Sequence, residues 1–121
     1  MAAGLATLRV LASKADYRGL ERKTRRLCGG MAALFRKKGI PVAVSRSGSM
    51  FTVFFTDRLV TDFASALRCD TRLFARYFNA MLRCGVSLPP SQFETAFVSF
   101  AHTEEDIDRT LEACGNALAS L

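Results

Sequence analysis

The sequence predicts an α+β domain in which helices cover one face of a small, mostly antiparallel sheet. Two observations lead to this class. Four segments repeat apolar residues at helical spacing, and two short stretches rich in valine, phenylalanine and threonine flank a turn-forming Ser-Gly pair. The expected element order is α-α-β-β-α-β-α. A length of 121 residues suits one domain, expected to occupy the whole of residues 1–121.

The first two elements are expected to be helices. Apolar residues recur at Leu5, Leu8 and Leu11 without a capping residue before them, so the chain is expected to begin inside a helix. A second helix is expected from Tyr17 to Lys38, because its apolar residues form one stripe and the following glycine can adopt a left-handed stop.

A β-hairpin is expected next. The stretches Pro41–Arg46 and Ser49–Thr56 have strand composition, and Ser47 with Gly48 can turn the chain between them. Residues 57–69 show no single period, which indicates an irregular excursion.

The remaining elements are two helices separated by extended chain. Asp70 or Thr71 is expected to cap a helix that ends at Gly85, and a short strand is possible at Val86–Leu88. Pro89 and Pro90 then force a turn or an extended passage. Residues 93–100 favour another strand, and Thr103 with Asp106 is typical of a capping box before the last helix.

Charge and cysteine content narrow the function classes. The net charge of +6 arises from 17 basic and 11 acidic residues, and five of the basic residues cluster at residues 18–26. We expect this cluster to be the solvated face of a helix and not a nucleic-acid site, because no nucleic-acid motif accompanies it. The four cysteines lack metal-site spacing, so we expect free thiols and a reducing, cytoplasmic compartment. No apolar run approaches the roughly 20 residues of a membrane span, so no membrane partner is expected.

Candidate site residues are sparse. His102 directly precedes a predicted helix, so we expect it to have a structural role and not to act as a general base. The acidic residues at 104–108 lie in the first turn of that helix, where we expect them to cap the helix and not to bind a metal ion. The polar group Ser91, Gln92 and Glu94 follows a rigid Pro-Pro pair, which can hold a site loop at low entropic cost. Glu94 is the leading candidate, although an exposed glutamate at a strand start is the commoner occurrence.

Three sequence blocks together resemble one enzyme family. They are MAAGLATL at residues 1–8, GSMFTVFFT with VTDFASA at residues 48–66, and LPPSQFE with AHTEEDIDRTL at residues 88–111. In these blocks and their spacing the chain resembles the glutamate-1-semialdehyde 2,1-aminomutases, which are pyridoxal-phosphate enzymes of the aminotransferase-like fold type I. The resemblance covers nearly the whole chain and implies the C-terminal small domain, starting inside the helix that leads out of the large domain.

The resemblance also implies a function. The family converts glutamate-1-semialdehyde to 5-aminolevulinate, the tetrapyrrole precursor, as a cytoplasmic or plastid homodimer in which pyridoxal 5'-phosphate carries the amino group. Its Schiff-base lysine has a glycine-rich context that no lysine here shares. The resemblance therefore implies a missing large domain as partner, and no cofactor or activity for this chain alone.

The family's SQFE motif supplies the site residues. The resemblance implies that Glu94 is an auxiliary acid near cofactor and substrate, with Ser91 and Gln92 as substrate-facing neighbours. This chain departs from the family pattern at two positions: it has Ser87 where the family frequently has tyrosine, and Leu67 where lysine is common. The alternative is a stand-alone interaction module that docks a separately encoded partner through an apolar face.

Overall fold

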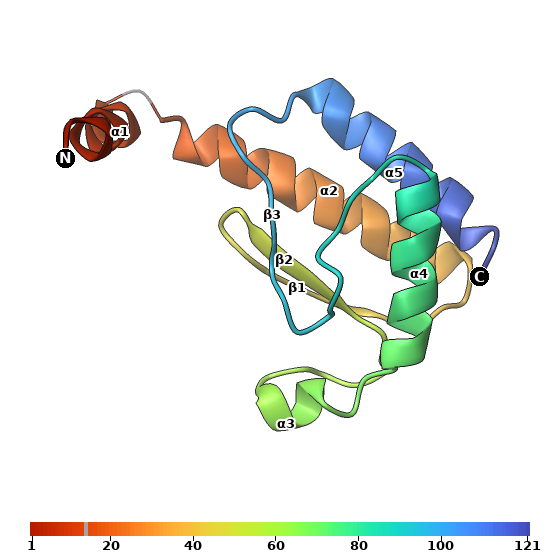
Figure 1. Cartoon of the computed structure of the whole chain (residues 1–121). Helices are drawn as coiled ribbons and strands as arrows, with labels where there is room; N and C mark the ends of the chain where they lie inside the picture. The colour runs from red at the N-terminus through yellow and green to blue at the C-terminus, as the bar shows by residue number, and fades with distance from the viewer. Residues whose placement is uncertain (14) are drawn as a thin grey trace.

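The fold is an α+β arrangement, as the sequence predicts. The computed structural model describes residues 1–13 and 15–121 (Figure 1). The elements are, in chain order, α1 (Ala2–Ser13), α2 (Tyr17–Lys37), β1 (Ala43–Ser47), β2 (Met50–Phe54), α3 (Phe63–Ala66), α4 (Thr71–Arg83), β3 (Ala96–Phe97) and α5 (Glu104–Leu118). The predicted order is confirmed, with one additional short helix, α3, inside the expected excursion.

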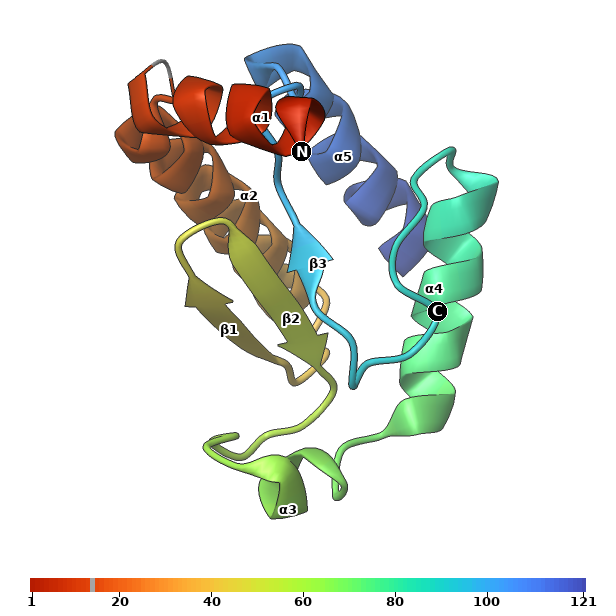
Figure 2. The ribbon, with the colours of Figure 1, turned by 60° about the vertical axis from the view of Figure 1, so that its left-hand side comes forward.

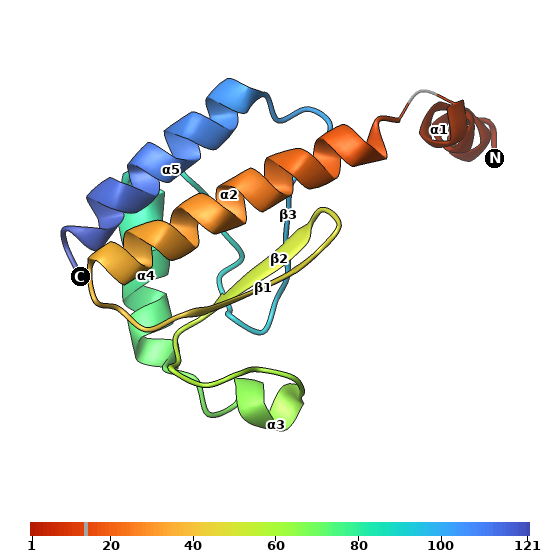
Figure 3. The ribbon, with the colours of Figure 1, turned by 180° about the vertical axis from the view of Figure 1, so that it is seen from behind.

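Helices cover one face of the sheet. The strands lie in the order β1-β2-β3 and all described pairings are antiparallel, with Val44 opposite Val53 and Phe51 opposite Ala96. Helices α2 and α5 run side by side (Figure 3), and α2 contacts both β1 and β2. Phe51 and Val53 are accordingly buried, whereas Met50 on the alternate face is exposed. Figure 2 looks onto that alternate face, which α2 and α5 leave uncovered.

An aromatic cluster forms the centre of the core. The rings of Phe35, Phe55 and Tyr77 lie 5.2 to 5.5 Å apart between centroids and join α2, the end of β2 and α4. The Tyr77 hydroxyl lies 3.6 Å from the Cys114 sulfur of α5, so four elements meet at this point. Burial raises the pKa of both the Tyr77 hydroxyl and the Cys114 thiol, which keeps this pair neutral.

The helix ends follow the capping signals in the sequence. Asp70 accepts a hydrogen bond from the Leu73 amide, and Thr103 with Asp106 forms the predicted capping box. Hydrogen bonds from Thr103 hold the pKa of the Asp106 carboxyl below its usual value. Gly39 stops α2 with a φ of 69°, a left-handed conformation that favours glycine.

The third strand is shorter than the sequence predicts. Residues 86–88 form no strand, and of residues 93–100 only Ala96 and Phe97 pair with β2. The reason is local hydrogen bonding: the Glu94 amide donates to the Ser91 carbonyl, which closes a turn where a strand would have continued. The hairpin turn also lies one residue later than expected, at Gly48 and Ser49.

The basic cluster of α2 is largely paired within the fold. Arg26 binds Glu104 at 2.9 Å and also Asp108, which ties α2 to the start of α5, and the Lys23 ammonium donates to the His102 carbonyl. These contacts support the prediction of a solvated helix face. They are exposed ion pairs and contribute little stability individually.

The cysteines are free, as predicted, and burial raises the pKa of Cys28 to about 11. Among the described residues, no helix has the length and apolar character needed to cross a membrane.

Candidate functional site

The polar turn at Ser91–Glu94 lies at the edge of the sheet, between the Pro89-Pro90 pair and β3. Three hydrogen bonds order its backbone. The Ser91 hydroxyl accepts from the Phe93 amide at 3.2 Å, and the Ser91 carbonyl accepts from the Glu94 amide at 3.1 Å. The Thr52 hydroxyl of β2 donates to the Glu94 carbonyl at 3.4 Å. The turn is thus fixed both internally and to the central strand.

The Glu94 side chain is exposed while its backbone is held. Its carboxylate makes no ion pair and accepts no hydrogen bond from any residue that the structure describes. A charged group on an ordered backbone, without an internal partner, is available to a group outside this chain.

The Gln92 side chain points the other way, into the protein. It is only 2% exposed, and within the described ranges 1–13 and 15–121 neither its amide nitrogen nor its amide oxygen has a hydrogen-bond partner. A buried polar group without a partner costs about 1 to 3 kcal/mol of stability. Sequence reasoning places Ser91, Gln92 and Glu94 together, and the structure separates them into an ordering hydroxyl, a buried amide and an exposed carboxylate.

Replacing Gln92 by methionine is expected to stabilise the chain by about 1 kcal/mol, because methionine keeps the shape and removes the unpaired amide. Urea denaturation of the purified chain measures this. The control is Asn116→Met at an exposed site of α5, where a change within about 0.5 kcal/mol is expected. A loss of stability in the Gln92 variant would show that the amide has a partner.

Helix α3 lies beside this turn. The rings of Phe63 in α3 and Phe93 in the turn are 6.0 Å apart between centroids. The helix has only four residues, but Asp62 and Ser65 fix its start through a reciprocal capping box. The Asp62 carboxylate accepts from the Ser65 amide and hydroxyl, both at 2.7 Å.

These hydrogen bonds give Asp62 a measurable signature. Hydrogen bonds from the Ser65 hydroxyl and then from its amide hold the pKa of Asp62 below the ordinary 3.8. Because the folded-state pKa is depressed, the stabilising contribution is complete above pH 3.8 and is lost as pH falls through the folded-state value. The Asp62 carboxyl resonance in NMR should therefore titrate below 3.8, and Ser65→Ala should move its midpoint upward. An unchanged midpoint in that variant would contradict the assignment.

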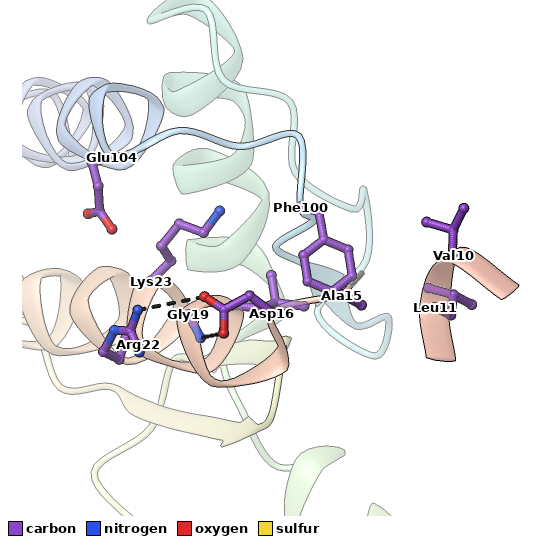
Figure 4. Close-up of a pocket in the computed structure, with 10 residues that line it drawn as sticks. Val10, Leu11, Ala15, Asp16, Gly19, Arg22, Lys23, Phe100 and Glu104 are labelled. Atoms are coloured by element: carbon purple, nitrogen blue, oxygen red, sulfur yellow. Dashed lines mark hydrogen bonds and ion pairs between the residues drawn. The ribbon is translucent and has the colours of Figure 1, made fainter. Parts of the chain in front are cut away.

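A cavity of about 470 Å³ lies elsewhere, between α1, the start of α2 and the start of α5 (Figure 4). Each of its charged side chains has a partner within the fold, and Glu104 pairs with Arg26. Arg22 lies 3.8 Å from Asp16, and Lys23 donates to the His102 carbonyl at 2.5 Å. No described residue leaves an unpaired buried charge there for a ligand, so this cavity is a weaker candidate than the Glu94 turn.

His102 has the structural role that the sequence favours. Its Nδ1 accepts from the Ser99 amide at 2.9 Å and lies 3.0 Å from the Ser99 hydroxyl. Within the described part of the chain, no three His, Cys, Asp or Glu side chains form a cluster that could hold a metal ion. Asp106 forms the capping box with Thr103, as predicted. Glu104 and Asp108 pair with Arg26, which the sequence does not predict.

Comparison with known proteins identifies close relatives. No family model matches the chain. The chain is 51% identical over 122 aligned residues to the glutamate-1-semialdehyde 2,1-aminomutase of Syntrophus aciditrophicus, and 54% identical over 119 residues to that of Thermus thermophilus. The alignments cover 100% and 98% of this chain and 28% of each relative. The chain thus spans little more than a quarter of the relatives it matches, and the resemblance seen in the sequence is confirmed.

Solved structures give the same result for the fold. The FumI protein of Sphingopyxis sp. MTA144, in its PLP internal aldimine form, matches with a TM-score of 0.81 at 27% identity over 98% of this chain. A glutamate-1-semialdehyde aminomutase from Pseudomonas aeruginosa PAO1, in complex with PMP, matches with a TM-score of 0.81 at 21% identity over 97% of this chain. This chain covers 26% and 27% of those two structures.

Two features of the site could not be found by sequence reasoning. Thr52 looks like an ordinary strand residue, and its hydrogen bond to Glu94 joins positions 42 residues apart. Phe63 lies in a segment without periodicity, so nothing local indicates its contact with Phe93. The capping pattern of Asp62 and Ser65 is the one signal that could have revealed α3.

Proposed function

We propose that this chain is the C-terminal small domain of a glutamate-1-semialdehyde 2,1-aminomutase, and that the complete enzyme converts glutamate-1-semialdehyde to 5-aminolevulinate. The observation that carries the proposal is the 51% identity to the Syntrophus aciditrophicus aminomutase along the whole chain. The α+β fold and its agreement with a PMP-bound aminomutase structure support it. The stand-alone interaction module has no comparable support.

The cofactor of the proposed enzyme is pyridoxal 5'-phosphate, which carries the amino group and acts as electron sink when bound. The described residues of this chain do not fit a complete site for it. Lys23 is engaged with the His102 carbonyl, Lys37 and Lys38 lie at the end of α2, and Lys14 is outside the described residues. None of the four has the glycine-rich sequence context of the family's Schiff-base lysine. We therefore assign the lysine and the phosphate contacts to the remaining three-quarters of the enzyme, and this chain alone is proposed to be inactive.

In this proposal the chain supplies one wall of the active site. Glu94 presents its carboxylate toward the cofactor and substrate from a turn that Ser91 and Thr52 hold in place. Ser91 and Gln92 are the flanking positions, with Ser91 ordering the turn and Gln92 packed beneath it. A fixed turn gives the carboxylate a defined position at little entropic cost.

The assembly and location follow the same proposal. The partner of this chain is the large domain of the same enzyme, and the complete enzyme acts in the cytoplasm as a homodimer. Sedimentation of the complete enzyme should give the mass of two subunits.

A hybrid enzyme tests the proposed function. In the Syntrophus aciditrophicus aminomutase, the matching quarter is replaced by this chain. The hybrid is expected to form 5-aminolevulinate from glutamate-1-semialdehyde, whereas the purified chain with pyridoxal phosphate should form none. A folded hybrid without activity would contradict the proposal, as would activity of the chain alone.

A further inference from the structure

Two hydrogen bonds from different parts of the fold hold the peptide groups on either side of the Glu94 Cα atom. The Glu94 amide donates to the Ser91 carbonyl at 3.1 Å, inside the turn. The Glu94 carbonyl accepts from the Thr52 hydroxyl of β2 at 3.4 Å, across 42 positions of sequence. Each residue has only two soft backbone dihedrals, so holding both peptide groups fixes the direction in which the Glu94 side chain leaves the backbone.

The strand pairing itself does not hold the Glu94 carbonyl. The pairing of β2 with β3 ends where Phe51 lies opposite Ala96. In the ranges that the structure describes, 1–13 and 15–121, no backbone amide donates to the Glu94 carbonyl. Figure 2 shows the chain bending beside the end of β2 before it enters β3. The Thr52 hydroxyl therefore supplies the donor at the point where the ladder of backbone hydrogen bonds stops.

Packing against β2 leaves this part of the turn incompletely supported. A cavity of about 20 Å³ lies between β2 and the turn, and Thr52, Ser91 and Glu94 are among the residues that line it. Groups that are fixed by packing alone are surrounded at close-packed density, without such a space. The hydrogen bond from Thr52 is therefore the link that sets the position of Glu94 relative to the central strand.

A threonine is well suited to this position. Its backbone is fixed, because β2 pairs with β1, where Ser45 lies opposite Thr52, and with β3 on its other side. A β-branched side chain has few accessible χ1 rotamers, so the hydroxyl is directed before the hydrogen bond forms. Serine offers the same donor on a less restricted side chain, whereas valine has the shape of threonine without the donor.

We infer that Thr52 is a positioning residue for the proposed reaction and acts on the reacting groups through Glu94. This inference rests on the proposed function. Thr52 fixes the backbone from which the Glu94 carboxylate extends and has no contact of its own with cofactor or substrate. A catalytic group must be held close to its productive geometry by the residues behind it, so loosening the Glu94 carbonyl lowers the fraction of time that the carboxylate is correctly placed.

Three variants of the hybrid enzyme test the inference. Thr52→Val is expected to lower kcat for 5-aminolevulinate formation about threefold to tenfold, as the loss of one hydrogen bond predicts, with KM within about twofold of the parent hybrid. Thr52→Ser should keep kcat within about twofold of the parent, because it keeps the donor. In the Glu94→Gln background, Thr52→Val should lower kcat no further, since two residues that act as a unit are not additive.

Thr95→Val is the matched control. Thr95 is the exposed neighbour of Glu94, and within the described part of the chain its hydroxyl makes no hydrogen bond. This variant should leave kcat and KM unchanged. Valine suits a strand as well as threonine does, so the free Thr52→Val chain should fold, and circular dichroism with urea denaturation verifies that it does.

The outcomes separate the inference from the proposed function. A loss in Thr52→Val that is absent in Thr52→Ser and disappears in the Glu94→Gln background supports the inference. A parent-like kcat in Thr52→Val, beside a slow Glu94→Gln hybrid, overturns the inference and leaves the proposed function standing. An equal loss in both backgrounds also overturns it, because Thr52 would then act through the fold and not through Glu94. A parent hybrid that folds but forms no 5-aminolevulinate overturns the proposed function, and the inference with it.

Discussion

In the hybrid enzyme, Glu94→Gln is expected to lower 5-aminolevulinate formation about a hundredfold, the low end of the range for a positioned acid or base. Glutamine keeps the length and shape of the side chain but removes its charge. The Glu94 carboxylate has no partner among the described residues, so the loss should come from the site and not from the fold. Steady-state measurement of kcat and KM, with urea denaturation of the free variant chain, separates the two.

Glu112→Gln is the matched control for this prediction. Glu112 is an exposed glutamate of α5, so its replacement by glutamine removes the same charge from the same chain. Its replacement should leave both kcat and stability unchanged. Equal activities of the Glu94 and Glu112 variants would show that Glu94 does not face the reacting groups.

Phe35→Ala is expected to destabilise the chain by about 3 to 5 kcal/mol, the usual cost of deleting a fully buried aromatic ring. Phe35 is 0% exposed and contacts both Phe55 and Tyr77. The deletion opens a cavity where α2, the end of β2 and α4 meet, and these elements cannot close it without losing other contacts. Chemical denaturation of the free chain measures the effect.

An exposed phenylalanine provides the comparison. Phe97 is 63% exposed on β3, so Phe97→Ala should change stability by no more than about 0.5 kcal/mol. A small effect at Phe35 would mean that the aromatic cluster is not the centre of the core.

The main helices could be predicted because their signals are local. The apolar stripe of α2 and its stop at Gly39 lie within one segment, and so does the capping box of Thr103 and Asp106. Such features depend on hydrogen bonds and burial between residues three or four positions apart. The structure therefore confirms them with small shifts at their ends.

Features that depend on distant contacts could not be predicted. The composition of residues 93–100 favours a strand, but the Ser91–Glu94 turn limits β3 to two residues. The burial of Gln92 could not be predicted either, because it depends on the position of this residue in the folded domain. A strand-like composition shows only that a segment would suit a half-buried position in a sheet. Whether the segment forms a strand depends on which neighbouring strands and side chains the fold places beside it.

The candidate site was partly predictable. The Pro89-Pro90 pair identifies a held polar loop, and the structure shows the ordered turn that follows it. The contact between Phe63 and Phe93 is different, since these residues are 30 positions apart and neither has a periodic context. Their contact is a result of folding that no short motif encodes.

A crystal structure of the hybrid enzyme with pyridoxal phosphate bound is the most direct test of the claim that this chain forms one wall of an aminomutase active site. The Ser91–Glu94 turn is expected to face the cofactor, with the Glu94 carboxylate directed into the site. A structure in which the domain is folded but the Glu94 turn faces solvent, away from the cofactor, would contradict it.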